Sequence, residues 1–487
     1  MKKLQTLTNS RRKFTRWEEK SNIFSNIPCY LLILKPSIMK KLLVVLSLFV
    51  SAIMAGQIVN IPDANFKTAL LAAADTNNDG EIQVSEAEVV ESLSVINGAI
   101  GSMEGIQSFI NLTYLNCSEN DYSELDLSQN VNLVELWCGR NNLTEVDLSQ
   151  NINLVELHCD STLITNLDLS HNLELVILYV SSNPFLTSLD VSQNQALERL
   201  WSVFGELTSL IIQNPNLKEL TALANQLSTI DVSQNPNLEY LNIGNNNLTE
   251  LDVTQNHNLE ALNFRLNSVN TIDISQNPNL IQLSFSHNEI STLDLSLSPN
   301  LNWLSCSNNL LTELDFTNNP ELYEVRVDGN SITELDFSVN TELYNLDCRD
   351  NQLVSLNLKN GNNAALLYCS LNNNPNLNCI QVDDPIAASN NSYWEKDALA
   401  VYSLDCALSL EVFETLQAVI YPNPVRDILT IESKENIASI EVYSMLGELI
   451  ASEMGVSQID FSSYAKGVYF LRIDTENGSV IQKIMKE

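Results

Sequence analysis

The sequence predicts a solenoid of short β-strands, and three observations lead to this fold class. First, an Asp within an apolar triplet recurs in eleven steps from Asp126 to Asn357, a distance of 231 residues and a mean period of 21. A fixed period of this size is typical of a chain that stacks one coil on the next. Second, apolar residues alternate within each period, as at Leu136 and Cys138, which predicts a strand. Third, Asn recurs in each period, often before Pro, and marks turns.

Each period reads Leu-x-x-Leu-x-Cys-x-x-Asn-x-Leu-Thr-Glu-Leu-Asp-Leu-Ser-x-Asn, with the segment 133–151 as an example. In this pattern the chain resembles the bacterial leucine-rich-repeat family over residues 107–378. We therefore expect about 12 coils of ~21 residues, because one coil cannot bury its apolar side chains without a neighbour. The resemblance also implies adhesion or internalin-like roles at a cell surface.

The N-terminal part contains an export signal. Met39, Lys40 and Lys41 precede an apolar run over 42–54 and then small residues, which predicts a secretory signal peptide at 39–56. Residues 1–38 are interpreted as an over-extended start, with an unusually long signal region as the alternative. No later segment approaches the ~20 apolar residues that span a bilayer. We therefore expect no transmembrane helix in the mature chain.

The mature chain is strongly acidic. The whole sequence has a formal charge of −35, and removal of residues 1–56 takes away 10 of 25 basic and 2 of 60 acidic residues, which leaves 15 − 58 = −43. Such a charge repels nucleic acid and favours cations or basic partners. A nucleic-acid-binding function is therefore excluded.

Residues 57–106 are predicted to form a small helical cap with a calcium loop. The segment between Asn65 and Glu91 reads as helix, acidic loop, helix, and Gly80 permits a sharp turn in the loop. The loop follows the twelve-residue EF-hand pattern, whose oxygen ligands suit Ca²⁺. The expected calcium ligands are Asp75, Asn77, Asp79, Glu81 through its carbonyl, Gln83 and Glu86. The alternative is an acidic loop that binds no metal.

Residues 379–415 are predicted to form a C-terminal cap and linker. Cys379 and Cys406 lie outside the repeated Cys column and flank a stretch that does not repeat. In an exported protein they are the expected disulfide pair, closing a cap over the last coil. Two unpaired thiols in a loose linker are the alternative. The Cys residues within the column exchange with Val, Ile and Phe, which favours buried hydrophobic positions over metal ligands.

From residue 416 the repeat stops, and alternating strands joined by Gly and Asn turns predict a small all-β sandwich over 416–487. Its segments include Tyr421-Pro422-Asn423-Pro424 and a strand over 467–473. They resemble the type A C-terminal sorting domain of the type IX secretion system of Bacteroidota. The resemblance implies recognition by that machinery and delivery to the medium or the outer cell surface.

The outward positions of the predicted strands provide candidate ligand-binding residues. One face carries aromatic rings in successive coils, at Tyr114, Trp137, His158, Tyr179 and Trp201. Such rings stack on sugars or anchor a protein partner. Alternatively, they stack on one another and stiffen the sheet. The opposite face repeats Glu-x-Asp, for which hydrogen bonds to turns or binding of cations are the two interpretations.

We therefore predict a secreted or surface-attached adhesion protein that recognises a glycan or protein through its solenoid face. The alternatives are a calcium-crosslinked structural component of a surface layer or biofilm and, third, a polysaccharide hydrolase. We do not expect an enzyme, because four scattered histidines and ubiquitous carboxylates identify no catalytic set.

Overall fold

The computed structural model describes residues 56–406, 418–433, 436–475 and 478–487. The predicted start and signal peptide, apart from Gly56, lie outside the described residues, as does the linker 407–417. The chain divides into two compact units, residues 1–269 and 270–487, which are described in turn.

The first unit begins with the small helical cap. Helix α2 (Ala64–Ala74) starts where the carboxylate of Asp63 accepts hydrogen bonds from the N–H groups of Asn65 and Phe66. Helix α3 (Val84–Ala87) is a single turn, shorter than the sequence suggested. It ends early because the chain enters its first strand, β1, at Ser92.

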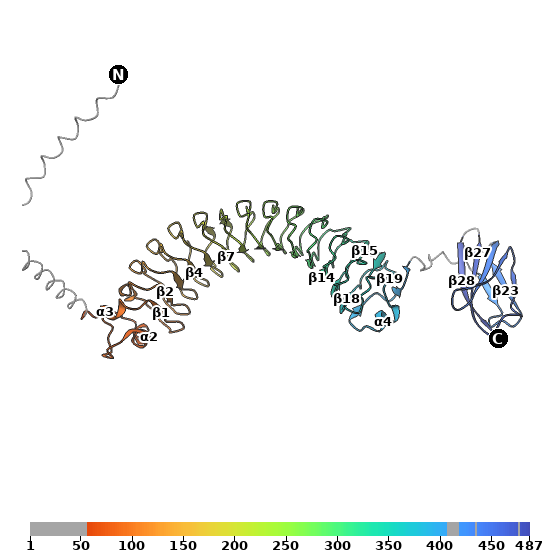
Figure 1. The fold of residues 1–487 in the computed structure, drawn as a ribbon, viewed down its shortest axis with the longest axis horizontal. Coiled ribbons are helices and arrows are strands. Elements are labelled where there is room, and N and C mark those ends of the chain that lie inside the picture. The colour runs from red at the N-terminus through yellow and green to blue at the C-terminus, as the bar shows by residue number, and fades with distance from the viewer. Residues whose placement is uncertain (1–55, 407–417, 434–435, 476–477) are drawn as a thin grey trace, which may run out of the picture. The chain divides into compact units, whose positions relative to one another are not determined.

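A parallel sheet of three-residue strands follows in the first unit, one strand for each coil (Figure 1). The middle residue of each strand is buried and its neighbours face outward, as the alternating pattern predicts. In sheet order the strands are β1 (Ser92–Ser94), β2 (Tyr114–Asn116), β3 (Glu135–Trp137), β4 (Glu156–His158), β5 (Ile177–Tyr179), β7 (Arg199–Trp201), β9 (Glu219–Thr221), β10 (Tyr240–Asn242) and β11 (Ala261–Asn263). A second small sheet pairs β6 (Ser188–Asp190) with β8 (Ser209–Ile211).

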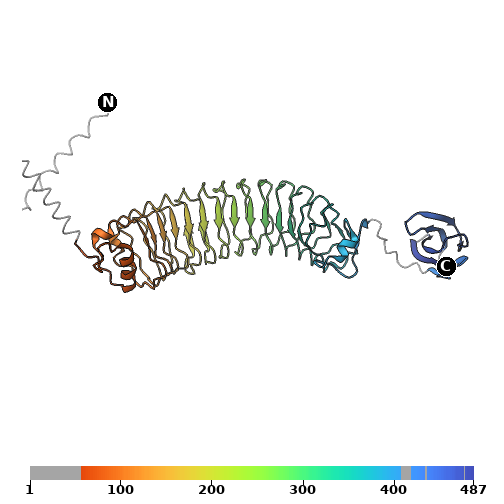
Figure 2. The same ribbon diagram turned by 60° about the horizontal axis from the view of Figure 1, so that its bottom comes forward.

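The second unit continues the same coil geometry, and Figure 2 shows its strands lying side by side. The sheet order is β12 (Gln282–Ser284), β13 (Trp303–Ser305), β14 (Glu324–Arg326), β16 (Asn345–Asp347), β18 (Tyr368–Ser370) and β20 (Trp394–Glu395). A further parallel sheet joins β15 (Glu334–Asp336), β17 (Ser355–Asn357), β19 (Cys379–Gln381) and β21 (Val401–Ser403). Helix α4 (Pro385–Asn390) follows β19 in the chain, precedes β20, and lies against β21.

The solenoid is longer than the expected 12 coils, since its main strands number fifteen. The additional strands β1, β18 and β20 carry little of the repeat pattern. Leu93 of β1 is in register with Leu115, and Trp394 of β20 is in register with Cys369. The ends of a parallel sheet expose unpaired backbone groups, so the capping segments complete the hydrogen bonding with sequences that do not repeat.

Two columns of buried asparagines connect neighbouring coils through hydrogen bonds. After most strands, an Asn amide donates to backbone carbonyls, and in several coils its oxygen accepts an N–H from the previous coil; Asn246, for example, binds the carbonyl of Ala222 and the N–H of Leu227. We call these the strand-end asparagines. The second column, the loop asparagines, donates across coils in the same way, as Asn151 does to the carbonyls of Leu127 and Asn130. These side chains satisfy backbone groups that no strand reaches.

The C-terminal domain is an all-β sandwich, as predicted. One antiparallel sheet contains β22 (Ala418–Tyr421), β23 (Ile428–Ser433) and β26 (Gln458–Asp460). The other contains β25 (Leu449–Met454), β24 (Ile437–Tyr443), β27 (Gly467–Thr475) and β28 (Gly478–Lys486). Their inner faces bury one apolar core that includes Leu429, Val442 and Leu471.

We predict that Asn151→Ala destabilises the solenoid by about 1–3 kcal/mol, because it removes two buried hydrogen bonds to the carbonyls of Leu127 and Asn130, each of which keeps only one backbone N–H donor. The matched control is Asn153→Ala, which removes only an exposed hydrogen bond to the carbonyl of Val131. Urea unfolding followed by circular dichroism measures both. Equal losses in the two variants would contradict a structural role for the buried column.

Candidate functional site

The clearest functional candidate is the aromatic row, which we define as Trp137, His158, Tyr179 and Trp201. These residues occupy the same outward position in β3, β4, β5 and β7 and are in direct register. The centroid distances between successive rings are 3.6, 4.3 and 4.3 Å, and the interplanar angles are 10°, 16° and 6°. The four rings therefore form one continuous stack across four strands.

The stack covers much of the ring surface, and Trp137, Tyr179 and Trp201 are only half-buried. Each inner ring is covered on both faces by its neighbours, and only 9% of His158 is exposed. Beyond the two ends, Trp137 is in register with Asn116 and Trp201 with Thr221. The structure thus shows the mutual stacking that was one of the two expectations. Such a platform is rigid and presents large amphipathic side chains at small entropic cost.

Tyr114, the fifth predicted binding residue, lies in the neighbouring outward column. Its register partner is Glu135. Its hydroxyl accepts a weak hydrogen bond from the amide of Asn116, at 3.5 Å. The structure therefore brings four of the five predicted aromatic residues together and places Tyr114 beside them.

Charged residues beside the aromatic row were missed by the sequence reasoning. Nε2 of His158 lies 2.6 Å from Oε1 of Glu156, and Arg199 lies 3.9 Å from Glu219. Burial raises the pKa of Glu219, and burial followed by the Glu219 carboxylate raises the pKa of Tyr179. The sequence would have revealed these charged residues if the third and fifth positions of each repeat had been considered together, because the two positions are neighbours on the outward face.

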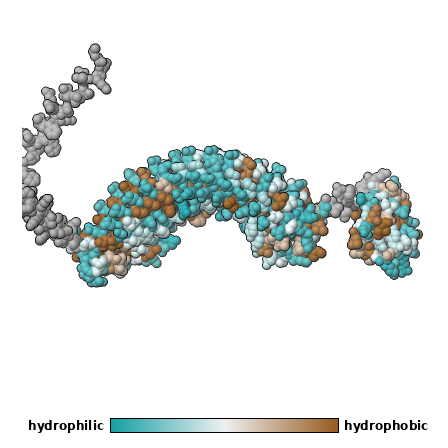
Figure 3. Space-filling view, viewed as in Figure 1, coloured by the Kyte–Doolittle hydropathy of each residue, from teal (hydrophilic) through white to brown (hydrophobic). Residues whose placement is uncertain are grey.

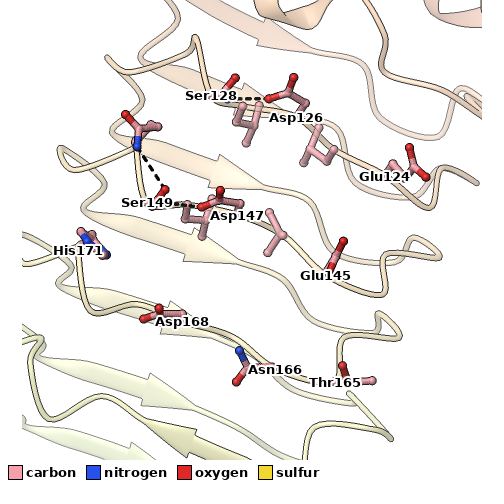
Figure 4. A pocket seen from close by; sticks show the side chains of 15 residues that line it. Glu124, Asp126, Ser128, Glu145, Asp147, Ser149, Thr165, Asn166, Asp168 and His171 are labelled. Atoms are coloured by element: carbon pink, nitrogen blue, oxygen red, sulfur yellow. Dashed lines mark hydrogen bonds between the residues drawn. The ribbon is translucent and has the colours of Figure 1, made fainter.

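The opposite face carries an acidic groove with a volume of about 600 Å³ (Figure 4). In the figure, Glu124 and Glu145 lie towards one end of the groove and His171 towards the other. The aspartates are used by the turns, since Asp147 accepts the N–H of Ser149 at 2.9 Å and Asp168 that of Ser170 at 2.9 Å. These bonds, together with the Ser hydroxyls, lower the pKa values of both carboxyls. Hydrogen bonding to turns therefore accounts for this repeated acid.

The EF-hand-like loop is closed by its own side chains. Oδ2 of Asp75 accepts the N–H of Gly80 at 3.1 Å, and Oδ1 of Asn77 accepts the N–H of Asp79 at 2.8 Å. Gly80 has a φ of +82°, which favours glycine. Oδ1 of Asp75 is buried and has no hydrogen-bond partner. The backbone of the loop therefore turns as in an EF-hand loop, with the side-chain oxygens of Asp75 and Asn77 on its inner side.

The remaining predicted ligands are engaged with one another. Gln83 accepts from the Asn77 amide at 2.7 Å and donates to Asp79 at 2.9 Å. Both oxygens of Glu86 accept backbone N–H groups, including those of Thr76 and Gln83. Burial acts to raise the pKa of Glu86, but these hydrogen bonds outweigh it and lower that pKa. Among the described residues, no three His, Cys, Asp or Glu side chains gather closely enough to hold a metal ion.

The loop lies against residues 57–59. The N–H of Val59 donates to the carbonyl of Ile82, and the N–H of Val84 donates to the carbonyl of Gln57, both at 2.8 Å. The side chain of Glu81 forms an ion pair with Lys67, in which Oε2 and Nζ are 2.6 Å apart. The backbone carbonyl of Glu81, which is the predicted calcium ligand, takes no part in this ion pair. The loop thus pairs with residues 57–59 as a short antiparallel segment.

The cysteines fall into two groups. Cys379 and Cys406 form a disulfide in the C-terminal cap, where the sequence placed one. The others are free and fully buried within the repeat, at Cys117, Cys138, Cys159, Cys306, Cys348 and Cys369. Burial raises the pKa of Cys117 to about 12, so its thiol stays protonated and apolar at neutral pH.

Comparisons with known proteins identify the two parts of the chain. The secretion system C-terminal sorting domain family matches residues 419–487. The functional domain of InlJ from Listeria monocytogenes, described as including a cysteine ladder, is 25% identical, with a TM-score of 0.58 over 88% of this chain and 98% of that chain.

The chain combines a leucine-rich-repeat fold with a C-terminal sorting domain.

Two further solved structures have the same fold as this leucine-rich-repeat protein. A leucine-rich-repeat protein from Leptospira interrogans is 25% identical, with a TM-score of 0.51 over 60% of this chain and 80% of that chain. An internalin (inlF) from Listeria monocytogenes is 20% identical, with a TM-score of 0.51 over 70% of this chain and 96% of that chain. No curated protein matches the chain.

The predicted repeat fold and the predicted sorting domain are thereby confirmed. The sorting domain supports secretion of the leucine-rich-repeat protein to the cell surface through the type IX system. In the described part of the chain, no helix is long and apolar enough to cross a membrane.

The turn aspartates give the leucine-rich-repeat protein a pH-dependent stability. Their lowered pKa values mean that the unfolded chain binds protons first, so this contribution is present at neutral pH and is lost as the pH falls below about 4. We expect Asp168→Asn with Asp315→Asn to lower the Tm by about 2 °C at pH 7, because exposed charge contacts contribute little. Thermal scans between pH 7 and 2.5 should show the difference from wild type disappearing, and a constant difference would contradict this origin.

Proposed function

We propose that the leucine-rich-repeat protein is an exported surface protein that binds a protein partner through the aromatic row. The observation that supports this most is the stack of Trp137, His158, Tyr179 and Trp201 on one open sheet face. Large, half-buried rings held rigidly are typical of the residues that dominate protein interfaces. A regular solenoid offers such extended surfaces in place of deep pockets.

A protein partner is favoured over a glycan at this row. A sugar ring stacks on an aromatic face, but here the inner faces are already covered by neighbouring rings. Trp137, Tyr179 and Trp201 and the adjacent carboxylates of Glu135 and Glu156 remain half-exposed for a partner's apolar and basic side chains. The formal charge of −43 after residue 56 also favours a partner with a basic rim.

The structural alternative, a calcium-crosslinked surface component, has less support from the acidic groove. Its aspartates already accept hydrogen bonds from their own turns, so they are less available for crosslinking cations. Figure 3 shows a mainly hydrophilic face with separate hydrophobic patches, which favours selective contacts over broad association.

Binding to an array of purified extracellular proteins tests the proposal, with wild type compared with the Trp137→Ala/Trp201→Ala double variant. We expect at least one selective partner, and an affinity in the double variant lowered by more than about thirtyfold, since interface anchors contribute roughly 2 kcal/mol or more. Trp303→Ala, which removes a half-buried tryptophan from β13, is the matched control.

An absence of selective partners would remove the recognition proposal. Selective binding that survives the double variant but is lost in the Trp303→Ala control would place the site elsewhere on the sheet. Circular dichroism on each variant separates these outcomes from loss of fold.

We further propose that the EF-hand-like loop binds calcium as a structural staple. The ligands would be Asp75, Asn77, Asp79, the carbonyl of Glu81, Gln83 and Glu86. The buried, unpartnered Oδ1 of Asp75 supports this, because a buried carboxylate oxygen without a partner is costly. Calcium supplies positive charge to this loop, which borders the segment 57–59.

Calcium should therefore raise the stability of the protein. If the dissociation constant is about 10⁻⁴ M, as in extracellular modules, ~10 mM calcium adds about 2.7 kcal/mol, or roughly 5 °C in Tm. Asp75→Asn should abolish the rise, while Glu91→Gln, an exposed acid in the same cap, should preserve it. The comparison is between scans in calcium and in EDTA, and an equal rise in both variants would show that the loop is not the site.

A further inference from the structure

A second aromatic cluster lies in the other unit, far along the sequence from the aromatic row. Tyr323 and Tyr344 occupy the second position of successive coils, and their rings stack with centroids 4.9 Å apart and 3° between planes. Tyr368 and Tyr393 continue the cluster through edge contacts at 6.4 and 5.4 Å. Three of these rings are well exposed, with Tyr323 at 46%.

Tyr323 has one covered face and one open face. Its backbone N–H donates to the carbonyl of Asn302, and the N–H of Tyr344 donates to the carbonyl of Tyr323, so the order along the column is Asn302, Tyr323, Tyr344. Tyr344 covers the face on its own side. The other face of Tyr323 is on the side of the coil of Asn302, and Tyr323 lines a hollow to which that coil contributes Asn300 and Asn302 and the coil of Tyr344 contributes Glu342.

This hollow is a shallow, open depression with a mixed polar and apolar lining. Its volume is about 590 Å³, within the range of ~300–1,000 Å³ for ligand pockets. Its lining consists of Ile281, Asn300, Asn302, Glu321, Tyr323 and Glu342. Within the described part of the chain, the side chains of Asn302 and Glu321 make no hydrogen bond, so their polar groups are available to a ligand.

The lining matches the two sides of a sugar ring. A pyranose presents C–H groups on its face and hydroxyl groups around its edge. An open tyrosine face suits the C–H groups. Amides provide donors and acceptors, and carboxylates accept hydroxyl protons. None of the six lining residues is cationic, and the two glutamates repel an anion.

We infer that the hollow at Tyr323 binds an uncharged hexopyranose unit of a glycan. The ring stacks on the open face of Tyr323, Asn300 and Asn302 hydrogen-bond to its hydroxyls, and Glu321 and Glu342 select against acidic sugars. This site is separate in residues and in unit from the aromatic row, so it adds a glycan-binding activity to the proposed protein-binding one.

Titration calorimetry of the purified protein with maltose, cellobiose, lactose and sialyllactose tests the inference. We expect saturable binding of at least one neutral disaccharide and weaker or no binding of sialyllactose. Tyr323→Ala should weaken binding by about tenfold or more, whereas Tyr323→Phe, which keeps the ring, should bind as wild type does. Asn302→Ala should weaken binding without removing any ring.

The matched control is Tyr240→Ala, which removes an exposed tyrosine from β10, in a different coil. It should bind the disaccharide as wild type does. Thermal scans establish that each variant is folded. The inference is overturned if no neutral disaccharide binds, if Tyr323→Ala binds normally, or if sialyllactose binds as tightly as lactose. Because the Trp137→Ala/Trp201→Ala variant leaves Tyr323 intact, it should retain sugar binding even where it loses its protein partner.

Discussion

The hydrogen bonds of the buried asparagines are the constraint on which the rest of the structure depends. Each main strand has three residues or fewer, so most of a 21-residue coil runs through turns whose backbone groups cannot pair within a sheet. Asn246 and Asn151 show how the two columns solve this, by binding backbone groups of their own coil and the previous one. A neighbouring residue also adopts a left-handed turn in each coil, such as Asn245 with a φ of 53°. The hydrogen bonds of the Asn side-chain amides stabilise these turns, although most residues disfavour the left-handed backbone conformation that the turns require.

Uniform coils convert sequence positions into columns in space. Because each strand pairs in register with the next, residues one coil apart, 20 to 25 positions along the chain, become neighbours, as Trp137, His158 and Tyr179 do. The same geometry creates the tyrosine cluster at Tyr323 and Tyr344. The exposure and the contacts of a side chain therefore depend on the residue in the same position one coil away. This property allows one scaffold to present two aromatic surfaces with different openness.

The difference between those surfaces has a simple physical origin. In the aromatic row, four consecutive rings stack on one another, so the faces of the inner rings are already covered by the protein and are not available to a ligand. At Tyr323 the column changes from tyrosine to Asn302, so the last ring has a second tyrosine on one side only and borders a hollow with a mixed polar and apolar lining. Continuous stacking favours a rigid contact surface, whereas the end of a stack favours a small planar ligand.

The sequence by itself determined the repeat, its period, the sorting domain and the position of the capping cysteines, because each depends on spacing along the chain. It underestimated the number of coils, because β1 and β20 pair with the sheet through backbone groups that leave little trace in the sequence. Only the tertiary structure decided that the rings of the aromatic row stack on one another, that Glu156 binds His158, and that Tyr323 has an open face. These features depend on ring orientation and on which neighbour lies one coil away. Periodicity places side chains in a column, but packing decides which of their surfaces stay exposed.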